Sequence, residues 1–176
     1  VFNALSGLVT PDSGELELFG RKVKWPKPHQ LIGDGISRTL QGVGLFPDLT
    51  VQENVMMGAN YFAKAGLFSS FLGAIEKDER RLRERAQSAL ERAYSGSLTD
   101  RRADTLAYPD TKRVSIARAL ICEPRILLLD EPAGGLGPQD IEWLNGLIKN
   151  LKSTTSIIIV EHHMDVVMSI CDRISV

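Results

Sequence analysis

The sequence predicts an α/β domain built on a parallel β-sheet that is covered by helices. Helix-like and strand-like segments alternate through the last third of the chain: helix 111–121, strand 126–129, helix 138–152, strand 156–160 and helix 164–172. Runs of Ile, Leu and Val dominate both strands, as is typical of parallel strands buried on both faces. The chain has 176 residues, 43% of them hydrophobic, which is enough for one compact domain with a smaller subdomain.

The composition excludes several classes of protein. The 21 basic and 22 acidic residues leave a net charge of -1, which argues against a broad nucleic-acid-binding surface. Cys122 and Cys171 are far apart and lack metal-ligand spacing, so a reducing compartment is expected. No apolar run reaches the roughly 18 to 20 residues that cross a bilayer.

The first half of the chain predicts shorter elements. Residues 1–8 have a helical composition, residues 11–14 form a turn signal, and residues 15–19 alternate acidic and apolar side chains like a half-exposed strand. The stretch from there to Pro28 is loop-like. A further strand is expected to open at residues 173–176.

Two helices are predicted in the middle of the chain. Thr50 and Glu53 have the spacing of a capping box at a helix start. Residues 76–94 place apolar side chains along one helix face, with i,i+4 ion pairs such as Glu79 and Arg83 on the others. Their balanced charges indicate a solvated face.

Polar side chains follow both aliphatic strands directly. Asp130 and Glu131 come after the first strand, and Glu161 and His162 after the second. Ligands of parallel sheets gather at the carboxyl ends of the strands, so these side chains are expected to share one crevice. Each residue alone has an ordinary explanation, such as a helix cap or a hydrogen-bonded structural histidine. Their combination favours a site in which Asp130 binds Mg²⁺ and Glu131 orients a water for attack on phosphorus.

With these motifs in order, the sequence resembles the nucleotide-binding subunits of ABC transporters over essentially its whole length. "ILLLDEP" resembles the Walker B segment, which implies a Mg²⁺ role for Asp130 and the catalytic-glutamate role for Glu131. "VEHHMD" resembles the switch segment, with His162 contacting the γ-phosphate of ATP. "AGGLGP" resembles the D-loop and contains Gly135, with Gly137 in place of the usual acid. In the Q-loop-like "RTLQGVGLFPDL", Gln41 is expected to reach the metal and the attacking water.

The signature motif departs from the family pattern. "DTLAYPDTKRVSIARAL" stands in its place, so Ala107, Tyr108, Pro109 and Asp110 are expected to face the ATP of an opposing subunit. Relatives usually have glycine where this chain has Pro109, which supplies no N–H. Ala107 offers no hydroxyl, and the Asp110 carboxylate would repel a γ-phosphate unless it turns away. The alternative is that Pro109 simply occupies an early helical turn, where proline is tolerated.

The resemblance also predicts the domain organisation. It implies a P-loop NTPase-like core in which residues 1–41 open the core and a β-subdomain, 42–108 form an inserted helical subdomain, and 109–176 form the catalytic core. The pattern G-x-x-x-x-G-K-[ST] is absent from the sequence. The chain is therefore expected to be a fragment, truncated at both ends, that lacks the P-loop, binds ATP weakly or not at all, and is inactive as an ATPase by itself.

The amino-acid sequence around the motifs is similar to that of the ATPase subunits of high-affinity branched-chain amino-acid importers and of their urea and amide relatives. The implied function is an ATPase that uses ATP and Mg²⁺, pairs with a second ABC ATPase subunit and powers integral membrane permease subunits. A solute-binding protein would be an indirect partner, with no nucleic acid involved. The expected location is peripheral, on the cytoplasmic face of the inner or plasma membrane.

One alternative is a degenerate subunit that serves mainly in assembly with an active paralogue. A weaker one is a soluble ATPase of DNA repair or translation.

Overall fold

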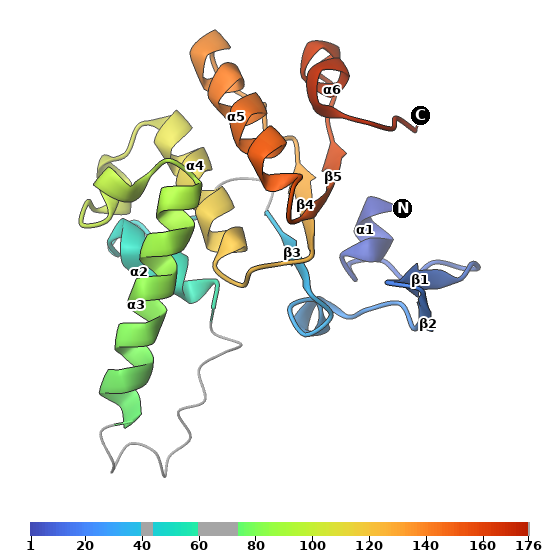
Figure 1. Cartoon of the computed structure of the whole chain (residues 1–176), viewed down its shortest axis with the longest axis horizontal. Helices are drawn as coiled ribbons and strands as arrows, with labels where there is room; N and C mark the ends of the chain where they lie inside the picture. Colours follow the sequence, from blue (N-terminus) through green and yellow to red (C-terminus); the bar gives the residue numbers. More distant parts are fainter. Residues whose placement is uncertain (40–43, 60–73, 176) are drawn as a thin grey trace.

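The computed structural model describes residues 1–39, 44–59 and 74–175 of the chain (Figure 1). Its helices are α1 (Phe2–Leu5), α2 (Val51–Met57), α3 (Ala74–Arg92), α4 (Tyr108–Leu120), α5 (Pro138–Leu151) and α6 (Met164–Ile170). Its strands are β1 (Leu16–Leu18), β2 (Arg21–Val23), β3 (Ile36–Arg38), β4 (Ile126–Asp130) and β5 (Ser156–Val160). Short 3₁₀ turns cover Pro28–Gln30, Gly96–Leu98 and Ala103–Thr105.

The predicted parallel sheet is present. Among the described residues it has the order β3-β4-β5, with Asp130 opposite Val160 at the end of the β4–β5 ladder. β4 is buried on both faces: Leu127 and Leu129 enter the large core shared with the helices, and Leu128 enters a smaller cluster with Ile36. This arrangement confirms the predicted α/β fold.

The edge strand β5 is less buried than its sequence predicts. Ile158 and Val160 are 39% and 41% exposed, although the aliphatic run favours a strand covered on both faces. On one face of β5 Ile157 and Ile159 pack against the large core, whereas Ile158 and Val160 lie on the opposite face, which stays open to solvent.

Two expectations for the shorter strands were wrong, and one short strand was not predicted. The stretch predicted as a loop contains β2, which pairs antiparallel with β1 across Phe19 and Gly20. Both turn residues have positive φ, as a tight two-residue hairpin turn requires, and every residue of β2 is exposed, so no hydrophobic alternation marks it. The three-residue strand β3 was not predicted. No strand forms at 173–175, because no described strand lies beside it to pair.

The middle helices form where predicted and pack on one another. In α3 the apolar stripe is buried, with Ala86 and Leu90 at 0% exposure, and Arg83 pairs with Glu79 at 2.6 Å. α2, α3 and α4 lie together on one side of the sheet, and α1 with the β1–β2 hairpin lies on the other (Figure 1). None of the helices in the described ranges has both the length and the apolar character needed to cross a bilayer.

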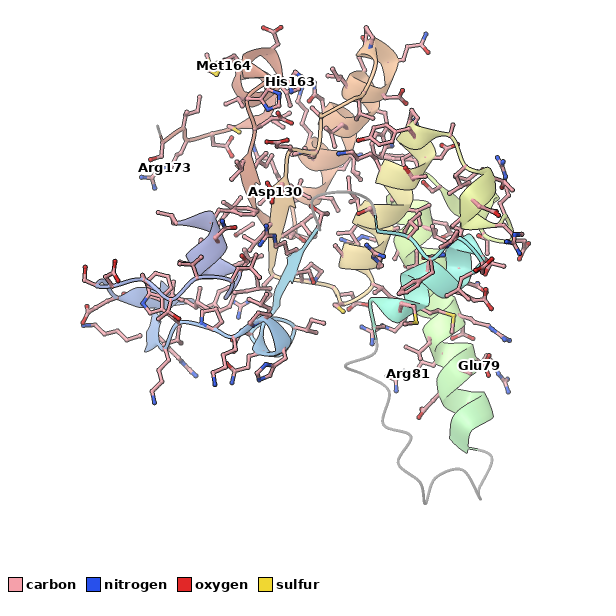
Figure 2. The ribbon with its side chains drawn as sticks, turned by 180° about the vertical axis from the view of Figure 1, so that it is seen from behind. Glu79, Arg81, Asp130, His163, Met164 and Arg173 are labelled. Atoms are coloured by element: carbon pink, nitrogen blue, oxygen red, sulfur yellow. The ribbon has the colours of Figure 1, made fainter. Side chains whose placement is uncertain are left out.

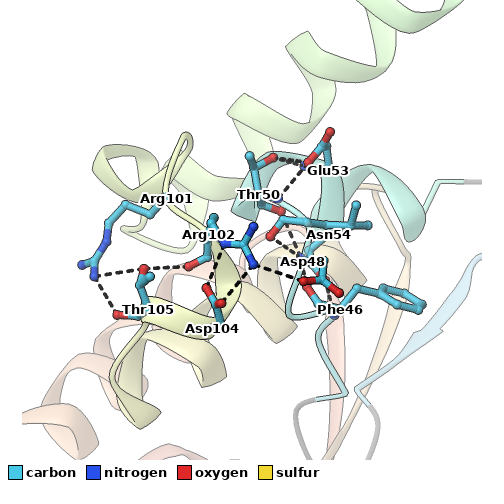
Figure 3. Close-up of polar contacts among 10 residues, drawn as sticks. Phe46, Asp48, Thr50, Glu53, Asn54, Arg101, Arg102, Asp104 and Thr105 are labelled. Atoms are coloured by element: carbon cyan, nitrogen blue, oxygen red, sulfur yellow. Dashed lines mark hydrogen bonds and ion pairs between the residues drawn. The ribbon is translucent and has the colours of Figure 1, made fainter.

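A polar network fixes the start of α2. Thr50 and Glu53 form the predicted capping box, with the Thr50 N–H donating to Glu53 Oε2 at 2.8 Å (Figure 3). The fully buried Asn54 amide accepts the Phe46 N–H at 2.7 Å and donates to the Phe46 and Thr50 carbonyls at 3.0 and 2.9 Å.

The same network reaches the segment that precedes α4. The Arg102 guanidinium bridges Asp48, at 3.1 Å, and Asp104, at 3.0 Å (Figure 3). An isolated β-bridge also pairs Thr50 with Arg102. The segment before α2 and the segment before α4 are therefore held side by side.

Candidate functional site

The loops that follow β4 and β5 meet at the carboxyl end of the parallel sheet, as predicted. Asp130 ends β4, and the N–H of Glu131 donates to the Val160 carbonyl at 2.9 Å. Glu131 has a φ of 45°, a left-handed conformation that is uncommon outside glycine and stores roughly 1 kcal/mol or more of strain. The chain turns sharply there, so the two consecutive acids have different surroundings: the Asp130 side chain is 13% exposed and the Glu131 side chain 43%.

Glu161 ties these two loops together. Its side chain has no exposed surface, and its Oε1 accepts the Ala133 N–H at 2.8 Å. Its Oε2 accepts the N–H groups of His162 and His163 at 2.9 and 3.2 Å and lies 2.8 Å from His163 Nδ1. Burial would raise the pKa of this carboxyl, but the His163 side chain and the three backbone N–H groups more than offset burial and lower it. Glu161 is therefore an ionised, hydrogen-bonded brace.

Glu131 and His162 face each other at the open side of this end of the sheet. His162 Nδ1 lies 4.0 Å from Glu131 Oε1, and its side chain is 64% exposed. The neighbouring His163 ring lies 4.2 Å from the His162 ring, centre to centre, and is 39% exposed. Figure 2 shows Asp130 and His163 in the region where β4 and β5 end. A carboxylate and an imidazole are thus presented together to an approaching ligand.

Asp130 is paired with a residue that the sequence did not single out. Arg38 at the end of β3 places Nη2 2.7 Å from Asp130 Oδ2, and both side chains are nearly buried. Arg38 also donates from Nη1 to Ser6 Oγ at 2.6 Å and stacks on the Phe2 ring at 4.9 Å. Carboxylate oxygens are the ligands that Mg²⁺ prefers, so Asp130 fits the predicted role through Oδ1, or through both oxygens if Arg38 moves.

The signature-like segment forms the start of α4. Ala107 is the N-cap residue, and Tyr108, Pro109 and Asp110 make the first turn. This is the position that the alternative interpretation of Pro109 expects, since the first-turn N–H groups have no helical partner to lose. The Asp110 carboxylate lies 3.7 Å from the Arg113 guanidinium of the same helix.

The same turn packs on the loop after β4. Tyr108 Oη donates to the Gly134 carbonyl at 3.2 Å. Gly135 has a φ of 76°, and a Cβ there would lie 2.8 Å from the Tyr108 ring, so only glycine suits this position. Gly137 is the N-cap residue of α5. Lys112 Nζ donates to the Glu131 carbonyl at 3.1 Å, which links α4 to the strained residue.

The structure therefore brings Asp130, Glu131 and His162 together, with the signature-like turn close behind them. Gln41 lies outside the described residues. Arg38, Lys112 and the bracing role of Glu161 were missed. Glu161 carried a signal, because it directly follows a strand. The Arg38–Asp130 pair joins residues 92 positions apart, and no local pattern indicates it.

Comparison with known proteins identifies the family. Residues 1–134 match the family model described as ABC transporter. The chain is 39% identical over its full length, and over 71% of the relative, to the high-affinity branched-chain amino acid transport ATP-binding protein LivG of Salmonella typhimurium. It is 37% identical, with the same coverage, to the corresponding protein BraF of Pseudomonas aeruginosa.

Solved structures agree. The ADP conformation of MJ1267, an ATP-binding cassette of an ABC transporter, matches with a TM-score of 0.81 and 29% identity, covering 97% of this chain and 68% of that one. The dimeric bacterial ABC transporter cassette MJ0796 matches with a TM-score of 0.73 and 25% identity, covering 96% of this chain and 71% of that one. The sequence motifs, the parallel sheet with its polar strand ends and these similarities lead to one conclusion: the chain belongs to the ABC transporter family.

Proposed function

We propose that the complete protein containing this chain binds and hydrolyses ATP as the nucleotide-binding subunit of an ABC importer for branched-chain amino acids or related small solutes. The observation that carries the proposal is the approach of Glu131 and His162, 4.0 Å apart at neighbouring strand ends next to Asp130. The names of LivG and BraF, high-affinity branched-chain amino acid transport proteins, support the choice of solute.

Each side chain has a role that suits its surroundings. The exposed Glu131 carboxylate accepts a hydrogen bond from a water and orients it for in-line attack on the γ-phosphorus. His162 would contact the γ-phosphate, and Gln41 would help to hold the metal and to position the same water. Mg²⁺, when bound, neutralises charge on the transferred phosphoryl group, and Asp130 is the residue that would hold it. The brace from Glu161 keeps the loops of Glu131 and His162 in register.

The assembly is part of the proposal. Residues 107–110 and the loop with Gly135 and Gly137 would face the ATP of a second ABC ATPase subunit, and the dimeric MJ0796 cassette supports such pairing. The proposed division is 1–41, 42–108 and 109–176, with the helical part against the integral membrane permease subunits. The protein would sit peripherally at the cytoplasmic face of the membrane, and a solute-binding protein would act through the permease.

The degenerate-subunit alternative has no support from the names of these relatives. Its physical basis was that Pro109 supplies no N–H and that the charge of Asp110 is repulsive. Arg113 lies 3.7 Å from that carboxylate and 3.0 Å from Asp140, so part of the charge is offset within the chain.

The test is Glu131→Gln in the complete protein. The variant keeps the size of the side chain but removes the carboxylate, and kcat for ATP hydrolysis is expected to fall about 100-fold or more, while ATP binding is retained. Glu142→Gln, at an exposed glutamate of α5, is the matched control and should leave kcat unchanged. Undiminished turnover of Glu131→Gln would remove this residue from its assigned role.

A further inference from the structure

We infer that Glu161, His162 and His163 form a binding site for a transition-metal ion of the Zn²⁺ type. One ligand atom from each of the three residues lies within 4.8 Å of the others. Glu161 Oε2 is 2.8 Å from His163 Nδ1 and 3.6 Å from His162 Nδ1. Glu131 Oε1 lies 4.0 Å from His162 Nδ1 and would reach the ion as a fourth ligand only by a side-chain movement.

The backbone explains why two consecutive histidines point the same way. In a continuing strand their side chains would alternate between faces. Here the chain leaves β5 at Val160, and Glu161 accepts the N–H groups of both histidines, so the loop curls around its carboxylate. His163 then serves as the N-cap residue of α6, and the two rings lie 4.2 Å apart with a tilt of 38°. The ligand atoms are thus held near one another by contacts that need no metal.

The donor set selects the kind of ion. Imidazole nitrogens and a carboxylate oxygen suit Zn²⁺, whereas Mg²⁺ prefers oxygen ligands alone. Bonds of about 2.0 to 2.1 Å in a tetrahedral site place ligand atoms roughly 3.4 Å apart, close to the 3.6 Å between Glu161 Oε2 and His162 Nδ1. The 2.8 Å contact with His163 Nδ1 would open by about half an ångström as the ion replaces the shared proton.

Access and charge agree with this assignment. The Glu161 side chain is wholly buried, so its negatively charged carboxylate lies at the base of the site in a fixed position. His162 and His163, 64% and 39% exposed, let an ion enter from solvent. The Arg38–Asp130 pair is a separate contact, so occupation of this site does not require Asp130.

Occupation of the site has a functional consequence, which rests on the function proposed above. A Zn²⁺ ion bound to His162 would take this side chain out of ATP hydrolysis and would place a cation next to the Glu131 carboxylate. Micromolar Zn²⁺ should therefore inhibit the ATPase in the presence of millimolar Mg²⁺, and a chelator should restore activity.

The test measures metal binding directly. Zn²⁺ is titrated into the purified complete protein by calorimetry in the presence of Mg²⁺, and Co²⁺ is used as a spectroscopic probe of nitrogen-containing tetrahedral coordination. One equivalent is expected to bind, and His162→Asn and His163→Asn should each weaken binding about tenfold or more. The control is His29→Asn, because His29 is an exposed histidine far from the cluster in sequence, and it should bind as the wild type does. Circular dichroism confirms that each variant is folded.

The outcomes separate the two proposals. Absence of saturable Zn²⁺ binding, or binding that only His29→Asn weakens, overturns the metal site and leaves the ATPase proposal standing. Zn²⁺ binding that depends on His162 and His163 supports the metal site even if the protein shows no ATPase activity, which would count against the proposed function alone.

Discussion

The network around Asn54 and the strand-end loops around Glu131 are both clusters of polar side chains between loops. They differ in how many of these side chains are hydrogen-bonded within the chain and how many are exposed to solvent. The Asn54 side-chain amide is completely buried, and both its N–H groups and its oxygen form hydrogen bonds with the backbone of residues 46–50. At the strand ends Asp130 and Glu161 are paired within the chain, whereas Glu131 and His162 are 43% and 64% exposed. Polar groups satisfied internally stabilise a fold, and those left facing solvent are available to a ligand.

The largest expected effect on stability comes from the buried, fully hydrogen-bonded network around Asn54. Asn54→Leu keeps a similar volume but leaves the Phe46 N–H and nearby carbonyls buried without their partner, so the free energy of unfolding should fall by about 3 kcal/mol. Urea unfolding of this chain measures the difference.

The matched comparison substitutes the solvent-exposed side chains at the strand ends, Glu131 and His162. Glu131→Gln and His162→Asn should each change the unfolding free energy by less than about 0.5 kcal/mol, because solvent-exposed substitutions rarely cost more. If these variants lost as much stability as Asn54→Leu, the contrast between the two regions would be broken.

An intermediate effect is expected for Asp130, the strand-end acid that is paired with an arginine. Arg38→Met would leave the nearly buried Asp130 carboxylate without its cation and should lower the unfolding free energy by about 2 kcal/mol. Arg83→Met is the control, since it removes the exposed pair with Glu79 and should cost at most about 0.5 kcal/mol. Equal losses for the two variants in urea unfolding would mean that burial of the Asp130 pair has no energetic weight.

The smallest effect concerns pH. The Thr50 N–H, and then the Thr50 hydroxyl, lower the pKa of the Glu53 carboxyl below its usual range. A carboxyl with a depressed folded-state pKa stabilises the fold above its unfolded pKa and loses that contribution as pH falls through the folded pKa. The advantage of the wild type over Glu53→Gln should be about 0.5 kcal/mol at pH 7, after screening by solvent, and should shrink below about pH 4.

The measurement is chemical unfolding of both proteins from pH 7 to pH 3. Glu142→Gln, on the exposed surface of α5, controls for the general effect of removing an acid and should show no such trend. An advantage that grows as pH falls would contradict the capping assignment.

Several features of the site followed from local sequence because their cause is local. The aliphatic run before Asp130 predicts a buried strand, and parallel strands place their carboxyl ends at one edge, so the meeting of Glu131 and His162 was predictable. The capping box at Thr50 needs only residues three apart. The exposed strand β2 and the short strand β3 were missed because neither carries the hydrophobic period that marks a strand.

The sequence by itself determined the parallel α/β core, the order of its motifs and the arrival of three acids and an imidazole at neighbouring strand ends, since periodicity and strand direction are encoded in consecutive residues. Only the tertiary structure decided which of those groups are open. The pairing of Asp130 with Arg38, the buried brace of Glu161 and the packing of Tyr108 on Gly135 join residues from separate elements. Such contacts depend on how the chain packs, and so no local pattern specifies them.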